Sequence, residues 1–355
     1  MNDQLKRCLD DLENRIDPCE EERLFQEWLQ FSAGEWKDQY FLPQRSQPNL
    51  PGVDWPTVLV NDALEDFDRM ALQQYGFCSN ELAYAGGDLL NARCNYGTSI
   101  IPLLFGVQPF FMDKNVDTLP TSHPLQDKTA IRRLVEAGIP DLRQGFGGRV
   151  LEMGERFTAI AAAYPLIGQY VHVVHPDLQG TMDICEIVWG SSLFLDIYDE
   201  PQLVHDFLNL IVETYSTFMG LWQRIHPPKS WGSVHWGIHL NGSIMLREDS
   251  ATNFSPKMVR QFILPYEQTL LDNFGGGGIH FCGRGDHFIS ILSELRGLHA
   301  VNMSQPELND LRKIFEYTVA RGINLIGLDL QFAEQALSDG IDLHNRVHCV
   351  LPTLK

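Results

Sequence analysis

The stretch GGGGIHFCGRGDHFISILSEL, residues 275–295, decides the fold class. It contains a short apolar strand at Gly278–Cys282, a glycine-rich turn, and an amphipathic helix at Phe288–Arg296. A strand that leads directly into a helix is the repeating unit of a parallel sheet, because parallel strands need a crossover connection. The glycines of 275–278 precede the strand, so they predict a helix end and a turn rather than a phosphate cradle.

The same alternation continues on both sides of this stretch. Further strands are predicted at Tyr170–His175, Val234–Leu240, Ala300–Met303, Asn324–Leu328 and Val347–Leu351. Helices are predicted between them at Pro201–Ile225, Pro256–Phe274 and Glu307–Arg321. The number of strand–helix units favours a closed (β/α)8 TIM barrel over an open sheet, and we expect it at residues 77–355.

Residues 1–76 are predicted to form an N-terminal helical extension. Its last helix, Val58–Tyr75, is followed by Gly76 in the position of a C-cap. Phe25, Trp28 and Leu29 share one helical face, and each costs about 1.5–3 kcal/mol when left in water. We therefore expect the extension to pack on the barrel or on a second subunit, which makes a homodimer an expected assembly.

Composition and charge exclude several classes of partner. The 355 residues contain 27 Lys and Arg against 46 Asp and Glu, a net charge of −19. This balance argues against nucleic acid and anionic membranes, since no basic patch offsets it. No signal sequence or membrane span is recognisable, and the seven scattered cysteines are typical of a reducing compartment. The sequence predicts a soluble cytoplasmic protein.

Polar residues gather after the predicted strands, where the chemistry of a barrel takes place. The substrate-binding candidates are Arg93, Asn95, Tyr96, Asp177, Gln179, Glu248 and Asp249. A capping role for Asp177 and Gln179, and a turn at Asn95–Gly97, are the structural alternatives. The amides of Gly283–Asp286 follow a strand and open a helix, so they are candidates for holding an anionic group.

His280 and Cys282 are the most informative pair. Two residues apart on a strand, their side chains point to the same face, and imidazole with thiolate suits zinc. The alternative is an ordinary buried pair in the core. Cys349 on the last strand is predicted to complete a His/Cys/Cys zinc set, with His344 and His348 as alternatives to it. Glu248 and Asp249 are candidates for the fourth position.

Several segments resemble the uroporphyrinogen decarboxylase superfamily. They are LNARCNYGTSIIPLLFG (90–106), DSATNFSPKMVRQFILPYEQTLL (249–271), the stretch quoted first, and GIDLHNRVHCVLP (340–352). The resemblance extends from Glu81 to the C-terminus, and its most specific parts are Ser255-Pro256, Pro265-Tyr266 and His280-x-Cys282-Gly283. It implies a (β/α)8 barrel. In the zinc-dependent methyltransferase branch a His-x-Cys motif and a distant Cys bind the metal, and His280, Cys282 and Cys349 match these places.

The expected function is zinc-dependent transfer of a methyl group between a corrinoid protein, or another methylated compound, and a thiol or other small acceptor. No Arg-rich N-terminal substrate motif of the true decarboxylases is found, which favours this branch. The first alternative is a metal-free decarboxylase of a porphyrinogen-like or other polycarboxylate. The second is a barrel that binds a tetrapyrrole or corrinoid without catalysis. The sequence identifies no catalytic residue.

Overall fold

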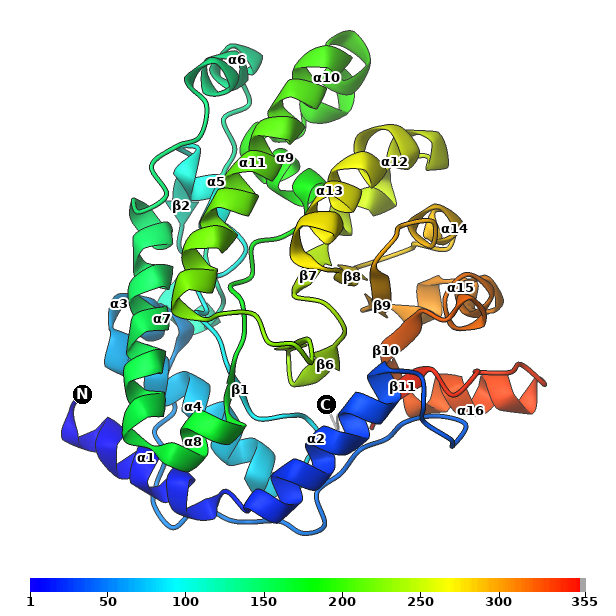
Figure 1. Cartoon of the computed structure of the whole chain (residues 1–355). Coiled ribbons are helices and arrows are strands. Elements are labelled where there is room, and N and C mark those ends of the chain that lie inside the picture. The colour runs from blue at the N-terminus through cyan, green and yellow to red at the C-terminus, as the bar shows by residue number, and fades with distance from the viewer. Residues whose placement is uncertain (352–355) are drawn as a thin grey trace.

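The computed structural model describes residues 1–351, which form a mixed α/β fold with helices around two parallel sheets (Figure 1). One sheet has the strand order β11-β10-β9-β8-β7, and the other pairs β1 with β4. Their bounds are β1 (Asn91–Ala92), β4 (His172–Val173), β7 (Ile244–Arg247), β8 (Gly277–Phe281), β9 (Leu298–Met303), β10 (Asn324–Asp329) and β11 (Val347–Val350). The predicted parallel α/β class is confirmed.

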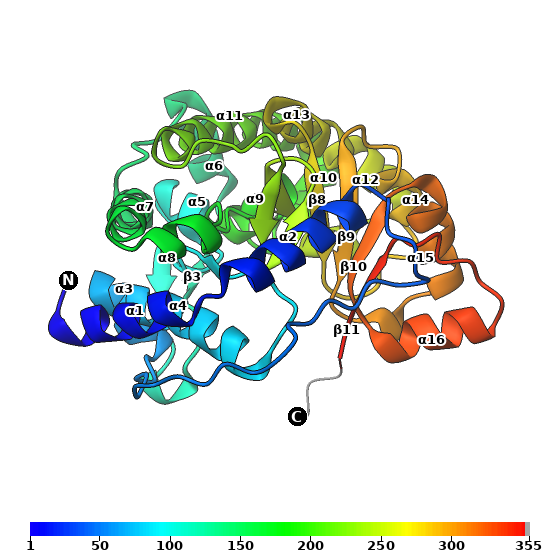
Figure 2. The same ribbon diagram turned by 60° about the horizontal axis from the view of Figure 1, so that its bottom comes forward.

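The helices lie outside the strands, except for α2, which crosses one end of the sheet (Figure 2). The N-terminal helices are α1 (Asp3–Arg15), α2 (Pro18–Ser32), α3 (Val60–Glu65) and α4 (Phe67–Tyr84). Those of the middle are α5 (Ile100–Leu104), α6 (Lys128–Ala137), α7 (Gly145–Ala163), α8 (Pro165–Tyr170), α9 (Thr181–Trp189), α10 (Leu193–Asp199) and α11 (Pro201–Ile225). The last are α12 (Pro256–Phe262), α13 (Leu264–Phe274), α14 (Ile289–Leu292), α15 (Leu311–Tyr317) and α16 (Leu330–Ser338).

Hydrogen bonds link the two sheets at one edge, and an N-terminal segment pairs with the other edge of the larger sheet. Between β4 and β7, the Met245 amide donates to His175 Nε2 at 2.9 Å, and the Gly180 amide donates to the Arg247 carbonyl at 2.7 Å. Beyond β11, Phe41 forms a parallel bridge with His348. The parallel strands and this N-terminal segment therefore surround a common interior.

A hairpin lies in that interior, where a single strand Val234–Leu240 was predicted. The structure instead has antiparallel strands β5 (Ser233–His235) and β6 (Ile238–Leu240), and β6 lies between the two sheets in Figure 1. Trp236 and Gly237 have φ of 52° and 79°, as a two-residue hairpin turn requires. A second small hairpin pairs β2 (Gln108–Phe110) with β3 (Thr121–His123) on the periphery.

The buried apolar residues form two clusters. The outer core fills the space between strands and helices, and includes Ile279, Phe281, Val301, Leu325, Val347 and Cys349. The inner core lies on the other face of the strands, and includes Trp28, Phe31, Phe41, Val234, Ile238, Met245 and Ile326. Since successive strand residues point to opposite faces, membership of one core or the other fixes the direction of each side chain.

The N-terminal segment closes one end of this interior. Trp28 and Phe31 of α2 are fully buried, and the Trp28 ring lies 4.7 Å from the ring of His348 between centroids. The Asn241 and Asn324 side chains donate to the Ser32 carbonyl at the end of α2, at 2.7 and 3.2 Å. Because Asn324 begins β10, α2 covers the amino ends of the strands.

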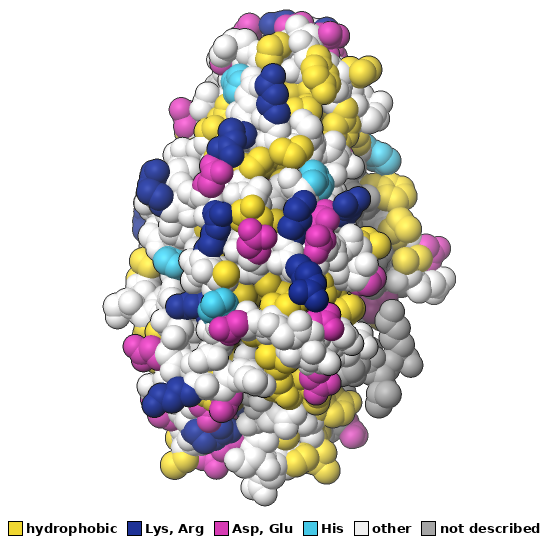
Figure 3. Space-filling model, turned by 90° about the vertical axis from the view of Figure 1, so that its right-hand side faces the viewer, with side chains coloured by type: hydrophobic (Ala, Val, Ile, Leu, Met, Phe, Trp, Pro, Cys, Tyr) yellow, Lys and Arg dark blue, Asp and Glu magenta, His cyan; other side chains and the backbone are white. Residues whose placement is uncertain are grey.

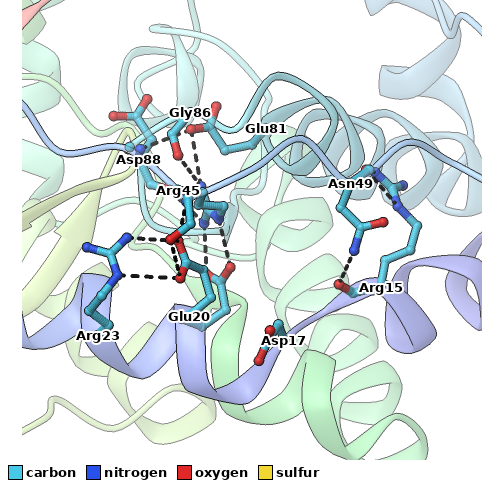
Figure 4. Close-up of polar contacts among 12 residues, drawn as sticks. Arg15, Asp17, Glu20, Arg23, Arg45, Asn49, Glu81, Gly86 and Asp88 are labelled. Carbon is cyan, nitrogen blue, oxygen red and sulfur yellow. Dashed lines mark hydrogen bonds and ion pairs between the residues drawn. The ribbon is translucent and has the colours of Figure 1, made fainter.

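Arg45 ties this segment to the body of the fold (Figure 4). Its guanidinium binds both carboxylate oxygens of Glu21 at 2.7 and 2.8 Å, and donates to the carbonyls of Gly86 and Asp88 at 2.6 and 3.0 Å. Both side chains of the Arg45–Glu21 pair are 3% exposed. Removing one partner of such a buried pair costs about 3–5 kcal/mol.

The predicted helix end at Gly76 is wrong. Helix α4 continues through this residue to Tyr84 and ends at Ala85, which takes the left-handed conformation with φ of 53°. Gly76 packs close to Trp55, since a Cβ built on it would lie 3.6 Å from the indole. A Cβ there would make an ordinary van der Waals contact, so the packing does not require glycine at this position.

The outer surface mixes charges of both signs over the last helices (Figure 3). Arg260 pairs with Glu294 at 2.5 Å, and Arg296 pairs with Asp272 at 2.9 Å. Among the described residues, no helix combines the length and the apolar character needed to cross a membrane. None of the seven cysteines is in a disulfide in residues 1–351.

Candidate metal site and substrate pocket

Three potential metal ligands meet at the carboxyl ends of β7 and β8. His280 Nε2 lies 3.3 Å from Cys282 Sγ and 3.6 Å from Asp249 Oδ1. His280 is on β8 and Cys282 follows it, while Asp249 lies two residues beyond β7. Ile279 and Phe281 point into the outer core, so His280 and Cys282 point away from it, as the sequence predicts.

The imidazole of His280 is held in one orientation by its neighbour on β9. The Asn302 side-chain amide donates to the Ile326 carbonyl at 2.7 Å, which turns its oxygen toward His280. Asn302 Oδ1 lies 2.6 Å from His280 Nδ1, so this nitrogen carries the proton and donates it. The lone pair is then on Nε2, the nitrogen that faces Cys282 and Asp249. Metal-binding histidines are commonly oriented through their second nitrogen in this way.

The spacing of the three ligand atoms fits zinc. Tetrahedral zinc, with Zn–N and Zn–O bonds of about 2.0–2.1 Å and a Zn–S bond of about 2.3 Å, places its ligand atoms about 3.3–3.6 Å apart. The distances from His280 Nε2 agree with that range, and all three ligand atoms lie within 4.8 Å of one another. A nitrogen, a sulfur and a carboxylate oxygen are all donors that zinc accepts.

Burial sets the protonation of these groups. It lowers the pKa of His280, which keeps the imidazole neutral and able to bind a metal. It also raises the pKa of the Cys282 thiol, which the nearby Asp249 carboxylate raises further and the Ser304 hydroxyl opposes. A bound cation would reverse this effect, because metal binding removes the thiol proton.

Backbone contacts fix Asp249 beside the pair. The Cys282 amide donates to Asp249 Oδ1 at 2.6 Å. The amides of Asp249 and Ser250 both donate to the Asp183 carboxylate from α9, at 3.1 and 2.7 Å. Burial raises the pKa of Asp183 to about 7. The loop after β7 is therefore held by its neighbours before any ligand binds.

Cys349 does not join the cluster, which corrects the predicted His/Cys/Cys set. It points into the outer core near Glu334 of α16, and burial raises its pKa to about 12. The alternatives to it also lie elsewhere. His348 faces the inner core against Trp28, and His344 lies beside Asp342 at 3.7 Å. Asp249, predicted for the fourth position, is the third ligand that the structure provides.

Three predicted substrate residues come together near the cluster. Asp177 pairs with Arg93 at 3.4 Å, accepts from Gln179 Nε2 at 2.8 Å, and also forms an ion pair with Arg247. Two guanidinium groups thus share one carboxylate. The Arg247 guanidinium also lies 4.6 Å from the ring centre of Trp236, whose indole is 5.3 Å from the ring of His280. Trp236 at the hairpin tip therefore lies between the Arg247 guanidinium and His280 of the candidate metal site.

The other predicted substrate residues lie outside this group. Tyr96 is fully buried in the outer core against Phe146, and Asn95 lies 3.5 Å from the Gln73 side chain of α4. Glu248 is fully buried and faces Glu267 of α13. Burial raises the pKa of Glu248 well above its ordinary value, and the neighbouring Glu267 adds to this effect, which favours the protonated form. Alternation along the chain explains this, since Glu248 and Asp249 point in opposite directions.

The predicted anion cradle after β8 is also wrong. The Gly283 amide donates to Gln305 Oε1 at 2.5 Å, and the amides of Gly285 and Asp286 donate to Asn309 Oδ1 at 2.7 and 3.1 Å. These amides already have side-chain partners. They stabilise the turn and are not free to hold an anionic ligand.

A pocket of about 220 Å³ lies between α4, β1 and the hairpin tip. Arg93 and Trp236 line it together with Asp88 and Glu81. Burial raises the pKa of Asp88 to about 7, and the neighbouring Glu81 carboxylate adds to the effect. Trp236 lines this pocket on one side and contacts His280 of the candidate metal site on the other.

Sequence reasoning missed Asn302, Trp236 and the pairing role of Arg247. Asn302 was detectable as the polar residue within an apolar strand, but its partner His280 depends on strand register. No protein-family model and no curated protein matches this chain.

Proposed function

We propose that this chain is a zinc-dependent (β/α)8 enzyme that transfers a methyl group from a corrinoid protein, or from another methylated compound, to a thiol or other small acceptor. The observation that carries the proposal is the Asp249, His280 and Cys282 cluster with its imidazole oriented by Asn302. The resemblance of the quoted motifs to the uroporphyrinogen decarboxylase superfamily supports the choice of reaction.

The strand arrangement supports the barrel part of the proposal. Within residues 1–351, seven parallel strands and the bridging segment at Phe41 offer eight positions for a barrel wall. The ligands lie at the carboxyl ends of β7 and β8, which is where barrel enzymes carry their active sites. The opposite end is covered by α2.

Arg93 and Arg247 indicate the charge of the methyl acceptor. Arg93 and Arg247 contribute two positive charges, and Asp177 neutralises one of them. The side chain of Arg247 is 17% exposed and that of Arg93 is 23% exposed, so neither guanidinium is sealed from solvent. An acceptor with an anionic group would bind there, with Trp236 as an apolar wall beside the cluster.

The residues of the chain have separate roles in this proposal. Zinc, when bound, lowers the pKa of a coordinated thiol and holds it as a nucleophile. His280, Cys282 and Asp249 hold the metal, and Asn302 keeps the His280 proton on Nδ1. Arg247 binds the anionic group of the acceptor.

Metal analysis of the protein purified without chelator tests the proposal. We expect one zinc per chain in the wild type, and loss of zinc in Cys282→Ser and in His280→Ala. Cys19→Ser, at an exposed position on α2, is the matched control and should retain zinc. A wild type that carries no zinc and gains none when zinc is supplied would overturn the proposal.

The same residues offer a second candidate function without metal. Cys282, His280 and Asn302 are arranged as a nucleophile, a base and a group that orients the base. The burial that raises the Cys282 pKa argues against a reactive thiolate, and the Gly283 amide is already bound to Gln305. Metal-free protein that is alkylated by iodoacetamide at Cys282 faster than at the exposed Cys19 would favour this candidate over the zinc enzyme.

A further inference from the structure

A cavity lies at the opposite end of β7 from the candidate metal site. It has a volume of about 450 Å³. Its lining includes Ser243, which directly precedes β7, whereas Asp249 follows that strand. The walls come from α2, α7, α8, α11, β4 and the base of the hairpin. No group of the proposed active site is among its lining residues, so the cavity needs a separate explanation.

Aromatic rings form much of the wall. Phe25 lies edge-on to Trp231 with 5.2 Å between ring centres, and it stacks on His172 at 5.6 Å. His172 and Trp231 are 5.4 Å apart, edge to face. Trp222 from α11 also lines the cavity. Flat walls of this kind favour a planar aromatic ligand, which stacks or packs edge-on with little loss of rotational freedom.

A few polar groups point to the rest of the ligand. Ser233 Oγ is buried and has no hydrogen-bond partner within the described part of the chain. Burial lowers the pKa of His172 to about 4, so its imidazole is neutral at pH 7 and can both donate and accept. Unsatisfied buried polar groups cost free energy, and a polar ligand atom removes that cost.

Charged side chains at the rim of the cavity bear on the charge that a ligand would carry. Lys229 is exposed and forms no ion pair in residues 1–351, although its charge acts on His172 and His226. The Glu21 carboxylate is already neutralised by Arg45. The exposed Glu22 also lines the cavity, and its hydrogen bond from the neutral Gln26 does not offset its charge. Lys229 is the only Lys or Arg among the lining residues of the described chain, so an anionic group of a ligand would pair with it.

We propose that this cavity binds a planar aromatic or heteroaromatic molecule that carries an anionic substituent. The ring lies among Phe25, His172 and Trp231, and the anionic group meets Lys229. Ser233 donates to a polar atom of the ring system. The inference stands on the cavity alone and does not depend on zinc or on methyl transfer.

Three matched probes test the proposal on the full-length chain: 2-naphthoate, 2-naphthalenemethanol and 2-naphthylmethylamine. Titration calorimetry gives the affinities, and quenching of tryptophan fluorescence reports contact with Trp231 and Trp222. We expect 2-naphthoate to bind at least fivefold tighter than the neutral alcohol. Its advantage in affinity over the amine should be larger. Lys229→Ala should remove the preference for the carboxylate, and Lys257→Ala, at an exposed position on α12, should keep it.

A second pair of variants tests the location. Ala161→Phe places a ring into the cavity from α7 and should abolish binding of all three probes, while Ala162→Phe on the exposed face should not. Ser233→Ala keeps the cavity open if Ala161→Phe does not fold, and should weaken 2-naphthoate. No binding of any probe at millimolar concentration, equal binding by Ala161→Phe and wild type, or a preference for the amine would overturn the proposal.

Discussion

Two strands of the same sheet, β8 and β11, each have a histidine and a cysteine on them or directly after them, yet only β8 contributes to the candidate metal site. On β8 the outward residues are Ile279 and Phe281, so His280 and Cys282 point away from the outer core. On β11, Cys349 points into the outer core with Val347.

His348, between them, faces the inner core instead. Its ring lies 4.7 Å from Trp28 and 5.9 Å from Phe41, in an apolar layer that α2 helps to form. The order His-x-Cys on β8 keeps both side chains on one face, whereas the adjacent His-Cys of β11 divides them between faces. The comparison shows that cysteine at a strand end is not sufficient for a metal site. The face on which it lies decides its role.

Replacing the two cysteines gives the largest expected difference. Cys282→Ser should lose stoichiometric zinc, because serine is a poor zinc ligand and only His280 and Asp249 remain. Its circular dichroism should stay that of the wild type, since Cys282 is only half-buried. Metal content by mass spectrometry checks this. Zinc retained by Cys282→Ser and lost by Cys349→Ser would reverse the comparison and restore Cys349 as the ligand.

Removing the support of the β8 histidine should have the next largest effect. Asn302→Leu deletes the acceptor of the His280 Nδ1 proton while leaving all three ligands in place. Second-shell losses of this kind weaken metal affinity by about 10–100-fold. Competition with a chelator of known affinity measures it. Ser304→Ala is the comparison variant, because it removes the hydroxyl beside Cys282 Sγ without touching His280, and its loss of affinity should be the smaller of the two. Unchanged affinity in Asn302→Leu would show that the imidazole orientation does not matter.

His348 of β11 should make the free energy of unfolding depend on pH. Burial lowers the pKa of His348 to about 3, so the folded protein keeps it neutral while the unfolded chain binds a proton below about pH 6.5. The unfolded state then binds more protons than the folded state, and stability falls as pH decreases from 6.5 toward 3.

The variant His348→Leu removes this contribution. Its loss of unfolding free energy between pH 7 and pH 5 should be smaller than that of the wild type by about 2 kcal/mol. Urea unfolding at the two pH values measures the difference. The variant also loses the acceptor for the Gly327 amide, so the comparison is made within each protein and not between them. Equal pH dependence in the two proteins would show that the pKa of His348 is the same in the folded and unfolded states.

Local patterns in the sequence predict a good part of this architecture. The helix Pro201–Ile225 is confirmed at both ends, and β8 lies within one residue of its predicted position. The hairpin was missed because Trp236 and Gly237 turn the chain inside an apolar run, with no polar turn residues to mark it. The strand β7 was also missed, although Asp249 after it was identified as a ligand candidate.

The candidate site was harder to predict because alternation fixes only relative directions. It places His280 and Cys282 on one face without saying which face is the inner one. The direction of Cys349 depends on the packing of β11 against α16 and on the position of Phe41, which pairs with β11 from more than 300 residues away. Asn302 reaches His280 only through the register of β8 and β9, which no local pattern reveals.

The smallest effect is expected at the cysteine of β11. Cys349→Val replaces a buried thiol by an apolar side chain of similar size, and volume-conserving changes in a core usually cost less than about 1.5 kcal/mol. Cys349 is 1% exposed and no hydrogen bond of its thiol is found among residues 1–351, so no buried polar partner is left unsatisfied. The variant should therefore keep both its zinc content and its unfolding midpoint close to the wild type. Cys349→Asp is the matched opposite, because it places a carboxylate in the outer core near Glu334 and should destabilise the fold strongly. If Cys349→Val lost zinc at unchanged stability, the two strand ends would be equivalent after all, and the cysteine would have to turn inward when the metal binds.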